Sequence, residues 1–333
     1  MLILGIESSC DDTCAAVLSK ERILSNVLSS QHQIHSRYGG VVPELASRQH
    51  LQSIHLIVSS ALEKAACTLD DIELVAATQG PGLIGSLLVG FSYAKSLAAV
   101  KNIPFVGVDH LAGHILSILL HEPKPAFPYL ALVVSGGTSS LYLAENYTSF
   151  QCLGRTRDDA AGEAFDKVAK ILGFSYPGGP QISRSAEDGN CEAISFPRAW
   201  LASDSLDFSF SGLKTAVANY VQQEKEHRRK LHYGNICACF QEAVVEVLVK
   251  KTLYAARQYG IQTVVLGGGV AANFRLRSQM QKACSAVGID FYCPELQLCT
   301  DNAAMIALAG WHAYRENGAT HLDQDVYSRS DLG

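Results

Sequence analysis

The sequence lacks several features that would each point to a particular class of protein. None of its ten cysteines belongs to a CxxC pair, which argues against a zinc ribbon and against the disulfide framework of a secreted protein. No hydrophobic run approaches the ~20 residues of a membrane-spanning helix, and no basic region precedes the first apolar stretch. We therefore expect a cytoplasmic protein that makes no use of a membrane.

Positive charge is also scarce. The chain has 27 Lys and Arg residues against 32 Asp and Glu, a net charge of −5. Because neutralisation of phosphates by Lys and Arg dominates nucleic-acid affinity, we expect no broad basic face that captures RNA unaided. The local exception is the run KEHRRKLH, Lys225 to His232, although such runs are usually solvated faces. Any contact with RNA is therefore expected to be local or shared with a partner protein.

Hydrophobic residues, by contrast, make up 48% of the 333 residues, and a chain of this length predicts two domains. An apolar strand, a tight polar turn and a second apolar strand occur twice, starting at Leu2 and at Leu130, and each hairpin is expected to open one lobe. Three prolines in HEPKPAFP, residues 121–128, mark the expected hinge. The predicted lobes are residues 1–125 plus 300–333, and residues 126–299.

The spacing of apolar residues predicts how each hairpin continues. Helical spacing occurs at residues 45–66, 86–100, 160–172 and 236–259, whereas residues 72–77 and 263–267 are typical of strands. A Gly/Pro loop is expected at YPGGP, residues 176–180. Helices on both faces of a sheet make this an α/β protein.

The sharpest metal signal is HLAGH, in which His110 and His114 stand at i and i+4 on one face of a predicted helix. Two imidazoles placed in this way can share an ion, but two histidines alone do not hold one. On spacing alone, two polar residues on a helix are an equal alternative. A metallopeptidase is disfavoured, because the HExxH site needs a glutamate directly after the first histidine and Leu111 occupies that position.

Three glycine-rich segments are candidates for binding phosphate. GPGLIG from Gly80 fits GxGxxG between a strand and a helix, with Asp109 as the acid that would meet a ribose. Pro81 removes a backbone donor there, so packing in a tight turn is the favoured interpretation. SGGTS from Ser135 lies at a hairpin bend, where backbone N–H groups can converge on an anion. GGGVAANFR from Gly267 follows a strand and opens a helix.

Carboxylates occur at bends and strand ends, where a nucleotide-binding cleft would need them. Asp158 and Asp159 precede a predicted helix, so capping is the plain interpretation for both. Asp301 follows a strand and opens DNAAMIALAG, which makes an N-cap and a site residue equal alternatives. Cys10, beside Asp11, is the one thiol placed to line a site. The remaining candidates are Glu7, Asp11, Asp12, Glu163 and Asp166.

The segments GIESSCDDT, YGGVVPELASRQH, GPGLIGSLLVG, DHLAGH, DDAAGEAFDKVAK, YPGG, FSFSGLKT and GGGVAAN occur in one order along nearly the whole chain. In this order they resemble the TsaD family, the tRNA N6-threonylcarbamoyltransferases. The resemblance implies the actin, Hsp70 and sugar-kinase fold class, with two RNase H-like lobes and a nucleotide in the cleft between them. It also implies transfer of a threonylcarbamoyl group from threonylcarbamoyl-AMP to N6 of the adenosine 3′ of the anticodon, in tRNAs that read ANN codons, with release of AMP.

Matching motifs also imply roles for individual residues. His110, His114 and Asp301 correspond to the metal ligands, and the divalent ion would be Fe²⁺ in preference to Zn²⁺. Asp11 is expected near the reacting group, as a general base or to orient the amine. Residues expected to bind the substrate are Val133, Val134, Ser135, Gly136 and Gly137 at the hairpin bend, with Asp166, Gly179, Ser183 and Asn273 at the nucleoside.

One residue departs from the family pattern: Thr138 stands where relatives usually have His or Asn after SGG.

The resemblance further implies a degenerate TsaB-like paralogue and a small, TsaE-like P-loop ATPase as partners, with tRNA as substrate. Two alternatives come from other functional classes, a phosphotransferase or ATPase of the same fold and a non-catalytic scaffold of a tRNA-modifying complex. Formation of ADP from ATP alone would identify the first, and indifference to metal removal the second.

Overall fold

A computed structural model describes residues 1–200, 204–330 and 332. The chain divides into two compact units, whose members are separated along the sequence. Unit 1 comprises Met1–Phe127, Ala144–Gln151 and Pro294–Gly333, and unit 2 comprises Pro128–Leu143 and Cys152–Cys293. The first division falls within the proline-rich segment. The units differ from the expected lobes chiefly at residues 144–151, which lie with unit 1 rather than in the second lobe.

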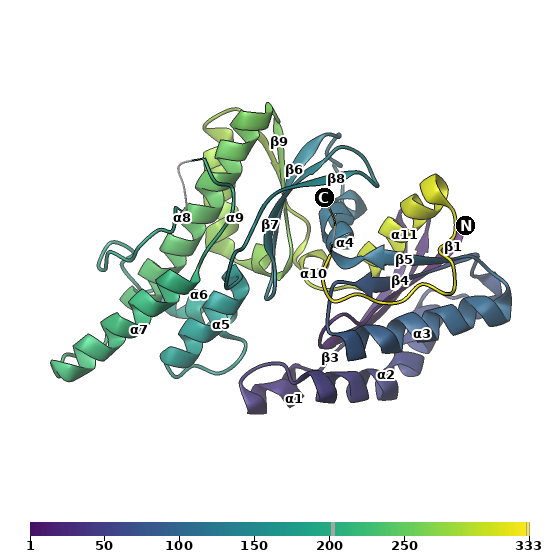
Figure 1. Ribbon diagram of the computed structural model, residues 1–333, viewed down its shortest axis with the longest axis horizontal. Helices are drawn as coiled ribbons and strands as arrows, with labels where there is room; N and C mark the ends of the chain where they lie inside the picture. The colour runs from purple at the N-terminus through teal and green to yellow at the C-terminus, as the bar shows by residue number, and fades with distance from the viewer. Residues whose placement is uncertain (201–203, 331, 333) are drawn as a thin grey trace. The chain divides into compact units, whose positions relative to one another are not determined.

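Within the described residues, ten strands form two five-stranded sheets, one for each unit (Figure 1). The strands of the first sheet are β1 (Leu2–Glu7), β2 (Asp12–Ser19), β3 (Arg22–Ser30), β4 (Leu74–Gly80) and β5 (Phe105–Asp109). Those of the second are β6 (Tyr129–Val134), β7 (Ser139–Ala144), β8 (Phe150–Arg155), β9 (Thr263–Gly267) and β10 (Asp290–Tyr292).

Eleven α-helices are present in the described part of the chain, together with short 3₁₀ turns. Those of unit 1 are α1 (His32–His35), α2 (Pro43–Lys64), α3 (Ile84–Lys101), α4 (His110–Leu116), α10 (Leu296–Cys299) and α11 (Ala303–Asn317). Those of unit 2 are α5 (Ala161–Ile171), α6 (Gly178–Ala186), α7 (Ser211–Glu226), α8 (Tyr233–Tyr259) and α9 (Phe274–Ser285). No helix among the described residues is long and apolar enough to cross a membrane.

The two sheets have the same topology. Strand order is β3-β2-β1-β4-β5 in unit 1 and β8-β7-β6-β9-β10 in unit 2. In unit 1 the hairpin pairs β1 and β2 antiparallel, and β1, β4 and β5 are parallel. In unit 2 β6, β9 and β10 are parallel. The predicted internal repeat of the opening hairpin is therefore confirmed, and it extends to all five strands of each sheet.

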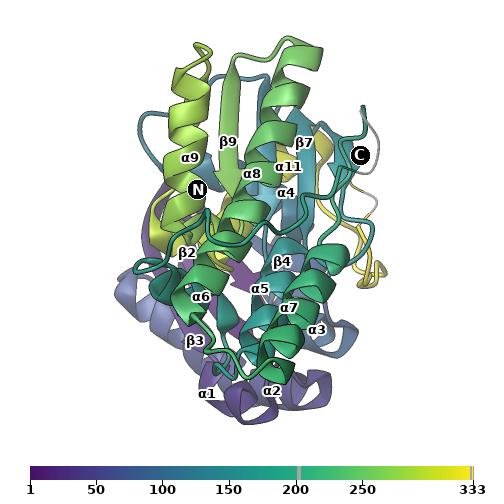
Figure 2. The same ribbon diagram turned by 90° about the vertical axis from the view of Figure 1, so that its left-hand side faces the viewer.

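Central strands are buried on both faces, which explains why they are continuously apolar. All six residues of β6 and five of six in β1 are buried, whereas the edge strand β3 is partly exposed. In unit 1, α2 and α3 cover one face of the sheet and α11 covers the other (Figure 1). In unit 2, α8 is central and packs beside α6, α7 and α9 (Figure 2). The predicted α/β layering is thus present in both units.

Helix α11 approaches its sheet closely because small residues face each other. A Cβ added at Gly5 would overlap the Ala303 carbonyl oxygen, and one at Gly310 would overlap the Ala76 side chain. All residues from Ala303 to Gly310 are buried, since the helix fills the space over the sheet. This contact places the residues just before α11, including Asp301, near the strand β1 of unit 1.

The GPGLIG segment serves packing, as its tight-turn interpretation predicts. A Cβ at Gly80 would overlap Tyr327, one at Gly82 would overlap Ser9, and one at Gly85 would overlap the Ser47 hydroxyl. Close approach of neighbouring chain therefore explains these glycines. The expected loop at YPGGP is shorter than predicted, because helix α6 already begins at Gly178.

Candidate functional site

The HLAGH segment forms the helix α4, directly after the strand β5. Asp109 ends the strand and caps the helix, because one of its carboxylate oxygens accepts hydrogen bonds from Leu111 N at 2.8 Å and Ala112 N at 3.4 Å. The other oxygen accepts from the hydroxyls of Tyr327 and Ser330. Asp109 therefore holds α4 and the C-terminal segment in place, and these four contacts leave it a structural role rather than that of a ribose-binding acid.

His110, His114 and Asp301 come together in unit 1. Asp301 Oδ1 lies 3.2 Å from His114 Nε2 and 3.4 Å from His110 Nε2. The two imidazole rings are nearly perpendicular, with centroids 4.6 Å apart. One ligand atom from each residue lies within 4.8 Å of the other two. Asp301 is thus a third candidate ligand, which spacing within HLAGH does not reveal because it lies 187 residues after His114.

The donor set fits a divalent transition metal. Two imidazoles and one carboxylate suit Fe²⁺ or Zn²⁺, and three protein ligands leave coordination positions open. His114 is fully buried, and within the described residues its Nδ1 has no hydrogen-bond partner. Its polar contact is the one that Nε2 makes with Asp301. The residues present are therefore those that such an ion requires.

Glu7, at the end of β1, lies directly behind His110. Its Oε2 is 2.8 Å from His110 Nδ1 and accepts a hydrogen bond from the Thr78 hydroxyl at 2.6 Å. Its Oε1 accepts from Ser9 N at 2.5 Å, and the Ser9 hydroxyl lies 3.3 Å from His110 Nδ1. The Glu7 side chain is completely buried. Sequence reasoning placed Glu7 at a bend and missed Thr78, because parallel pairing of β1 and β4 brings them together only in the fold.

The cluster is an electrostatically coupled group. Burial raises the pKa of Glu7, but the neighbouring His110 outweighs this and holds it below its usual value. Burial also opposes ionisation of Asp301, whose pKa is nevertheless lowered by both histidines. For His110 the two carboxylates overcome burial and raise the pKa well above its usual value, whereas burial lowers that of His114. The pKa directions of Glu7, Asp301 and His110 therefore depend on one another.

The bend between β1 and β2 carries Cys10 and Asp11, both half-buried. The Asp11 carbonyl oxygen accepts a hydrogen bond from Gln31 N, which fixes the backbone of the bend. Burial raises the pKa of the Cys10 thiol, with a further contribution from Asp11, so this cysteine is a poor nucleophile. Burial also raises the pKa of Asp12 to about 7, and one of its carboxylate oxygens has no hydrogen-bond partner within the described residues.

Two capping interpretations prove wrong. Asp301 does not cap α11, because the neighbouring Asn302 does so, with its side-chain oxygen accepting from Met305 N at 3.0 Å. Asp158 and Asp159 do not cap α5, which begins at Ala161 and has Ala160 at its N-cap position, without a side-chain cap. The carboxylate of Asp158 instead accepts four hydrogen bonds from the start of α7, and that of Asp159 pairs with two lysines, Lys167 and Lys214. Sequence proximity to a helix was misleading in both cases.

In unit 2, the bend between β6 and β7 follows two buried valines, Val133 and Val134. It is closed by hydrogen bonds from Ser135 N to Thr138 O at 2.8 Å and from Thr138 N to the Ser135 hydroxyl at 3.1 Å. A Cβ added at Gly136 or at Gly137 would meet no atom within 4 Å. The bend thus exposes backbone with free space beside it, as an anion-binding turn would require.

The GGGVAAN segment reaches the same strand end. Gly268 has φ +85°, and a Cβ there would overlap the Val134 carbonyl oxygen. Only glycine fits this close approach. The third glycine-rich segment therefore lies beside the end of β6, next to the bend that Ser135 opens.

Asp166 and Gly179 are brought near each other by the turn into α6. Asp166 Oδ1 accepts a hydrogen bond from Gly178 N at 2.7 Å, and a Cβ at Gly178 would overlap the backbone of α5. Gly179 is open on the side where a Cβ would project. The YPGG turn is therefore fixed to α5 through Asp166, which leaves the position of Gly179 free of neighbouring atoms.

Ser183 and Asn273 meet at a third residue, Gln241. The Asn273 amide donates to Gln241 Oε1 at 2.8 Å and to the Ser183 hydroxyl at 2.9 Å, and that hydroxyl donates to Gln241 Oε1 at 3.1 Å. Asn273 also caps α9 by accepting from Leu276 N. Gln241 is a buried polar residue among the apolar residues of α8, and this was the signal that sequence reasoning missed.

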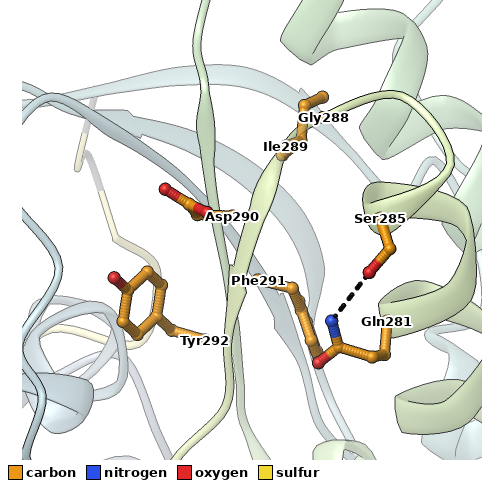
Figure 3. Close-up of a pocket in the computed structure, with 7 residues that line it drawn as sticks. All are labelled: Gln281, Ser285, Gly288, Ile289, Asp290, Phe291 and Tyr292. Carbon is orange, nitrogen blue, oxygen red and sulfur yellow. Dashed lines mark hydrogen bonds between the residues drawn. The ribbon is translucent and has the colours of Figure 1, made fainter.

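Beside the edge strand β10 lies an open hollow of about 530 Å³ in unit 2. Figure 3 shows its lining residues, among which the Gln281 side chain is hydrogen-bonded to Ser285. The lining also includes Asp290, Phe291 and Tyr292. None of the candidate residues described above lies on this hollow, so we do not assign the candidate site to it.

Comparisons with known proteins agree over the whole chain. The model of the TsaD family, described as tRNA N6-adenosine threonylcarbamoyltransferase, matches residues 22–308. A protein of that name from Desulfotalea psychrophila is 60% identical over 337 residues, which cover 100% of this chain and 98% of the relative. A second, from Desulforapulum autotrophicum, is 51% identical over 331 residues and covers 99% of each chain.

Among solved structures, full-length HypF in its phosphate- and nucleotide-bound form gives a TM-score of 0.64 at 15% identity. The match covers 96% of this chain and 56% of that one. At this identity the likeness concerns the fold alone, and it confirms the predicted fold class. With the family model and the relatives it leads to one conclusion: the chain belongs to the TsaD family of tRNA N6-adenosine threonylcarbamoyltransferases.

Proposed function

We propose that this protein transfers a threonylcarbamoyl group from threonylcarbamoyl-AMP to N6 of the adenosine 3′ of the anticodon, in tRNAs that read ANN codons. The observation that carries the proposal is the family match, which extends to a relative 60% identical along the whole chain. Family membership favours transfer over the two alternatives, an ATPase of the same fold and a non-catalytic scaffold. The amine nitrogen forms a bond to the carbamoyl carbon, the bond from that carbon to the phosphate oxygen breaks, and AMP leaves.

We propose His110, His114 and Asp301 as the ligands of a divalent ion, Fe²⁺ in preference to Zn²⁺. Their convergence, with Asp301 within 3.4 Å of both histidines, and the burial of His110 and His114 support this assignment. When bound, such an ion supplies Lewis acidity at the carbamoyl oxygen. The Glu7 and Asp301 carboxylates give this part of unit 1 the negative charge that a cation needs.

Further residues are proposed to bind the adenylate. The bend formed by Ser135, Gly136 and Gly137, together with the preceding Val133 and Val134, offers backbone groups beside open space. The nucleoside portion would be held by Asp166, Gly179, Ser183 and Asn273. Asn273 donates with both amide hydrogens already, so its remaining capacity is as an acceptor, which suits a ribose hydroxyl or an adenine amine.

Asp11 is proposed to receive the proton that N6 loses, or to orient that amine. Its place on the bend that follows β1, in the same unit as the His/His/Asp cluster, supports the role. A positioned acid or base of this kind contributes ~10²- to 10⁴-fold to a rate. If an Asp11→Ala variant had unchanged turnover, this assignment would be wrong.

The proposal extends to the setting of the reaction. We propose a cytoplasmic enzyme that acts with a TsaB-like paralogue and a TsaE-like ATPase, because the net charge of −5 provides little attraction for tRNA. We also propose that the side chain of Thr138 affects contacts with the substrate while the bend itself stays intact. The bend is closed by the backbone of Thr138, which hydrogen-bonds to Ser135 whatever the side chain is.

The decisive experiment supplies the purified protein and its companion proteins with unmodified tRNA and threonylcarbamoyl-AMP. Digested tRNA is then analysed for threonylcarbamoyladenosine by mass spectrometry, with His110→Ala in parallel. We expect product with the wild-type protein and its loss in the variant. ADP formed from ATP in place of modified tRNA would support the ATPase alternative.

A further inference from the structure

Glu7 is a buried carboxylate to which the proposed function assigns only its negative charge. Its side chain is completely inaccessible, and removing a charge from water is costly unless hydrogen bonds and opposite charge compensate it. Compensation comes from Ser9 N, from the Thr78 hydroxyl and from His110, each within 2.8 Å. A residue used only for packing would not require so many polar partners.

The contact with His110 determines which of its nitrogen atoms faces the cluster. A carboxylate only accepts hydrogen bonds, so His110 Nδ1 must carry the hydrogen that points at Glu7. The opposite nitrogen, Nε2, then faces Asp301 Oδ1 at 3.4 Å and lies beside His114. In this tautomer the lone pair on Nε2 is free for a ligand.

His114 provides an internal comparison. It is as deeply buried as Glu7, but within the described residues its Nδ1 has no hydrogen-bond partner. Its ring contacts Asp301 through Nε2, and a hydrogen bond from the Ser117 hydroxyl to the His114 carbonyl oxygen stabilises the helix turn. Both rings contact Asp301 through Nε2, but only His110 has a second carboxylate, Glu7, at its Nδ1.

We propose that Glu7 is a positioning residue for the binding of a divalent metal. Glu7 accepts a hydrogen bond from His110 Nδ1–H and so fixes the tautomer of His110. His110 Nε2 is then presented to an ion shared with His114 and Asp301. The inference rests on the metal site of the proposed function. A carboxylate behind a ligating histidine fixes the ring and increases its basicity, and loss of such a partner typically weakens metal binding ~10- to 100-fold.

The test is a measurement of metal affinity on the full-length protein. Apo-protein prepared with a chelator is titrated with Zn²⁺ in competition with a chromogenic chelator, and Co²⁺ absorption reports the coordination geometry. In Glu7→Gln one carboxylate oxygen is replaced by an NH₂ group, which faces either Ser9 N–H or His110 Nδ1–H. In either orientation a hydrogen bond is replaced by a contact between two donors. We expect Zn²⁺ affinity to fall ~10- to 100-fold, with an altered Co²⁺ spectrum.

Thr78→Val is the matched control, because it removes one hydrogen bond to Glu7 but leaves the contact with His110. We expect it to change Zn²⁺ affinity less than threefold. Thermal unfolding of each apo-variant shows whether the fold is intact, and long-range ¹H–¹⁵N correlation of the histidine rings reports the tautomer of His110. That tautomer should shift in Glu7→Gln and remain in Thr78→Val.

The outcomes separate this inference from the proposed function. If Glu7→Gln folds and binds Zn²⁺ within twofold of wild type while His110→Ala does not, the positioning role is wrong and the metal site stands. If Glu7→Gln abolishes binding as fully as His110→Ala, Glu7 is itself a ligand and the inference is overturned. If His110→Ala leaves affinity unchanged, the metal site fails, and the positioning role fails with it.

Discussion

In unit 1 the candidate residues are side chains from distant parts of the sequence, whereas in unit 2 many of them are backbone groups at tight turns. His114 and Asp301 are 187 residues apart and meet in a buried cluster backed by Glu7. Gly136, Gly137 and Gly179 instead offer open space beside the chain. The difference teaches that a metal site depends on neighbouring side chains for its geometry, while an anion-binding bend depends on backbone conformation. Each kind of site should therefore fail in its own way.

The largest effect is expected from two adjacent residues in unit 1. Asp301→Ala removes a proposed ligand and should reduce formation of threonylcarbamoyladenosine by more than ~100-fold, the upper range for loss of a mere supporting residue. Asn302→Ala removes the cap of α11 and should cost about 1–2 kcal/mol of stability with little change in rate at 25 °C. Rates by mass spectrometry and unfolding by denaturant test the pair. If both variants lost activity equally, Asp301 would act by supporting α11 and not as a metal ligand.

A second pair separates backbone strain from binding in unit 2. Gly268 has a positive φ and faces the Val134 carbonyl oxygen, so Gly268→Ala should destabilise the protein by roughly 3 kcal/mol. Gly137→Ala meets no atom and should change stability by less than ~0.5 kcal/mol, but it should raise the KM for threonylcarbamoyl-AMP. Denaturant unfolding and steady-state kinetics check this. An unchanged KM in Gly137→Ala would argue against substrate binding at the bend.

Acid should affect the two units in different pH ranges. Burial lowers the pKa of His312 in unit 1 to about 4, against the attraction of Glu21 and with repulsion from Arg315 and Lys124. As the pH falls below ~6.5, the unfolded state binds a proton that folded His312 does not, so stability decreases until about pH 4, by on the order of 3 kcal/mol. His312→Gln should abolish this loss.

In unit 2 the sign is the same but the range is lower. Burial raises the pKa of Asp158, yet hydrogen bonds from Ser209, Phe210 and Ser211 outweigh it and lower the pKa below its usual value. The stability that these bonds provide is therefore present above pH ~4 and is lost only as the pH falls through the lowered value. Hydrogen exchange measured segment by segment should show unit 1 opening first. Simultaneous opening of both units would contradict the distinction.

A modest effect on both stability and substrate binding is expected at Ser183. Ser183→Ala removes a hydroxyl that donates to Gln241 and accepts from Asn273, but the direct Asn273–Gln241 hydrogen bond remains. We expect about 1 kcal/mol of destabilisation and a modest rise in the KM for the adenylate. Calorimetric titration with AMP would measure the binding change, and affinity equal to wild type would limit Ser183 to a structural role.

How much of this was predictable depends on the range of the interactions involved. The HLAGH helix, both opening hairpins and the long helix α8 follow from local apolar spacing and were predicted. The resemblance in ordered motifs, rather than spacing, pointed to Asp301. Capping was predicted wrongly at Asp158 because its real partners start α7, more than fifty residues later. Glu7 was read as one carboxylate among several, since its pairing with His110 requires β1, β4 and α4 to be in place.

The discontinuity of unit 1 has a consequence for the timing of biosynthesis. Glu7 and His110 both lie within the first 127 residues, but the segment that carries Asp301 is made only after the whole of unit 2. At about 5–20 residues per second, roughly 10 to 40 seconds separate the synthesis of His114 from that of Asp301. During this interval the nascent chain holds two of the three proposed ligands and the space that α11 will fill. Metal can therefore be captured by the complete cluster only near the end of translation, so insertion of the ion becomes a late step in the maturation of the enzyme.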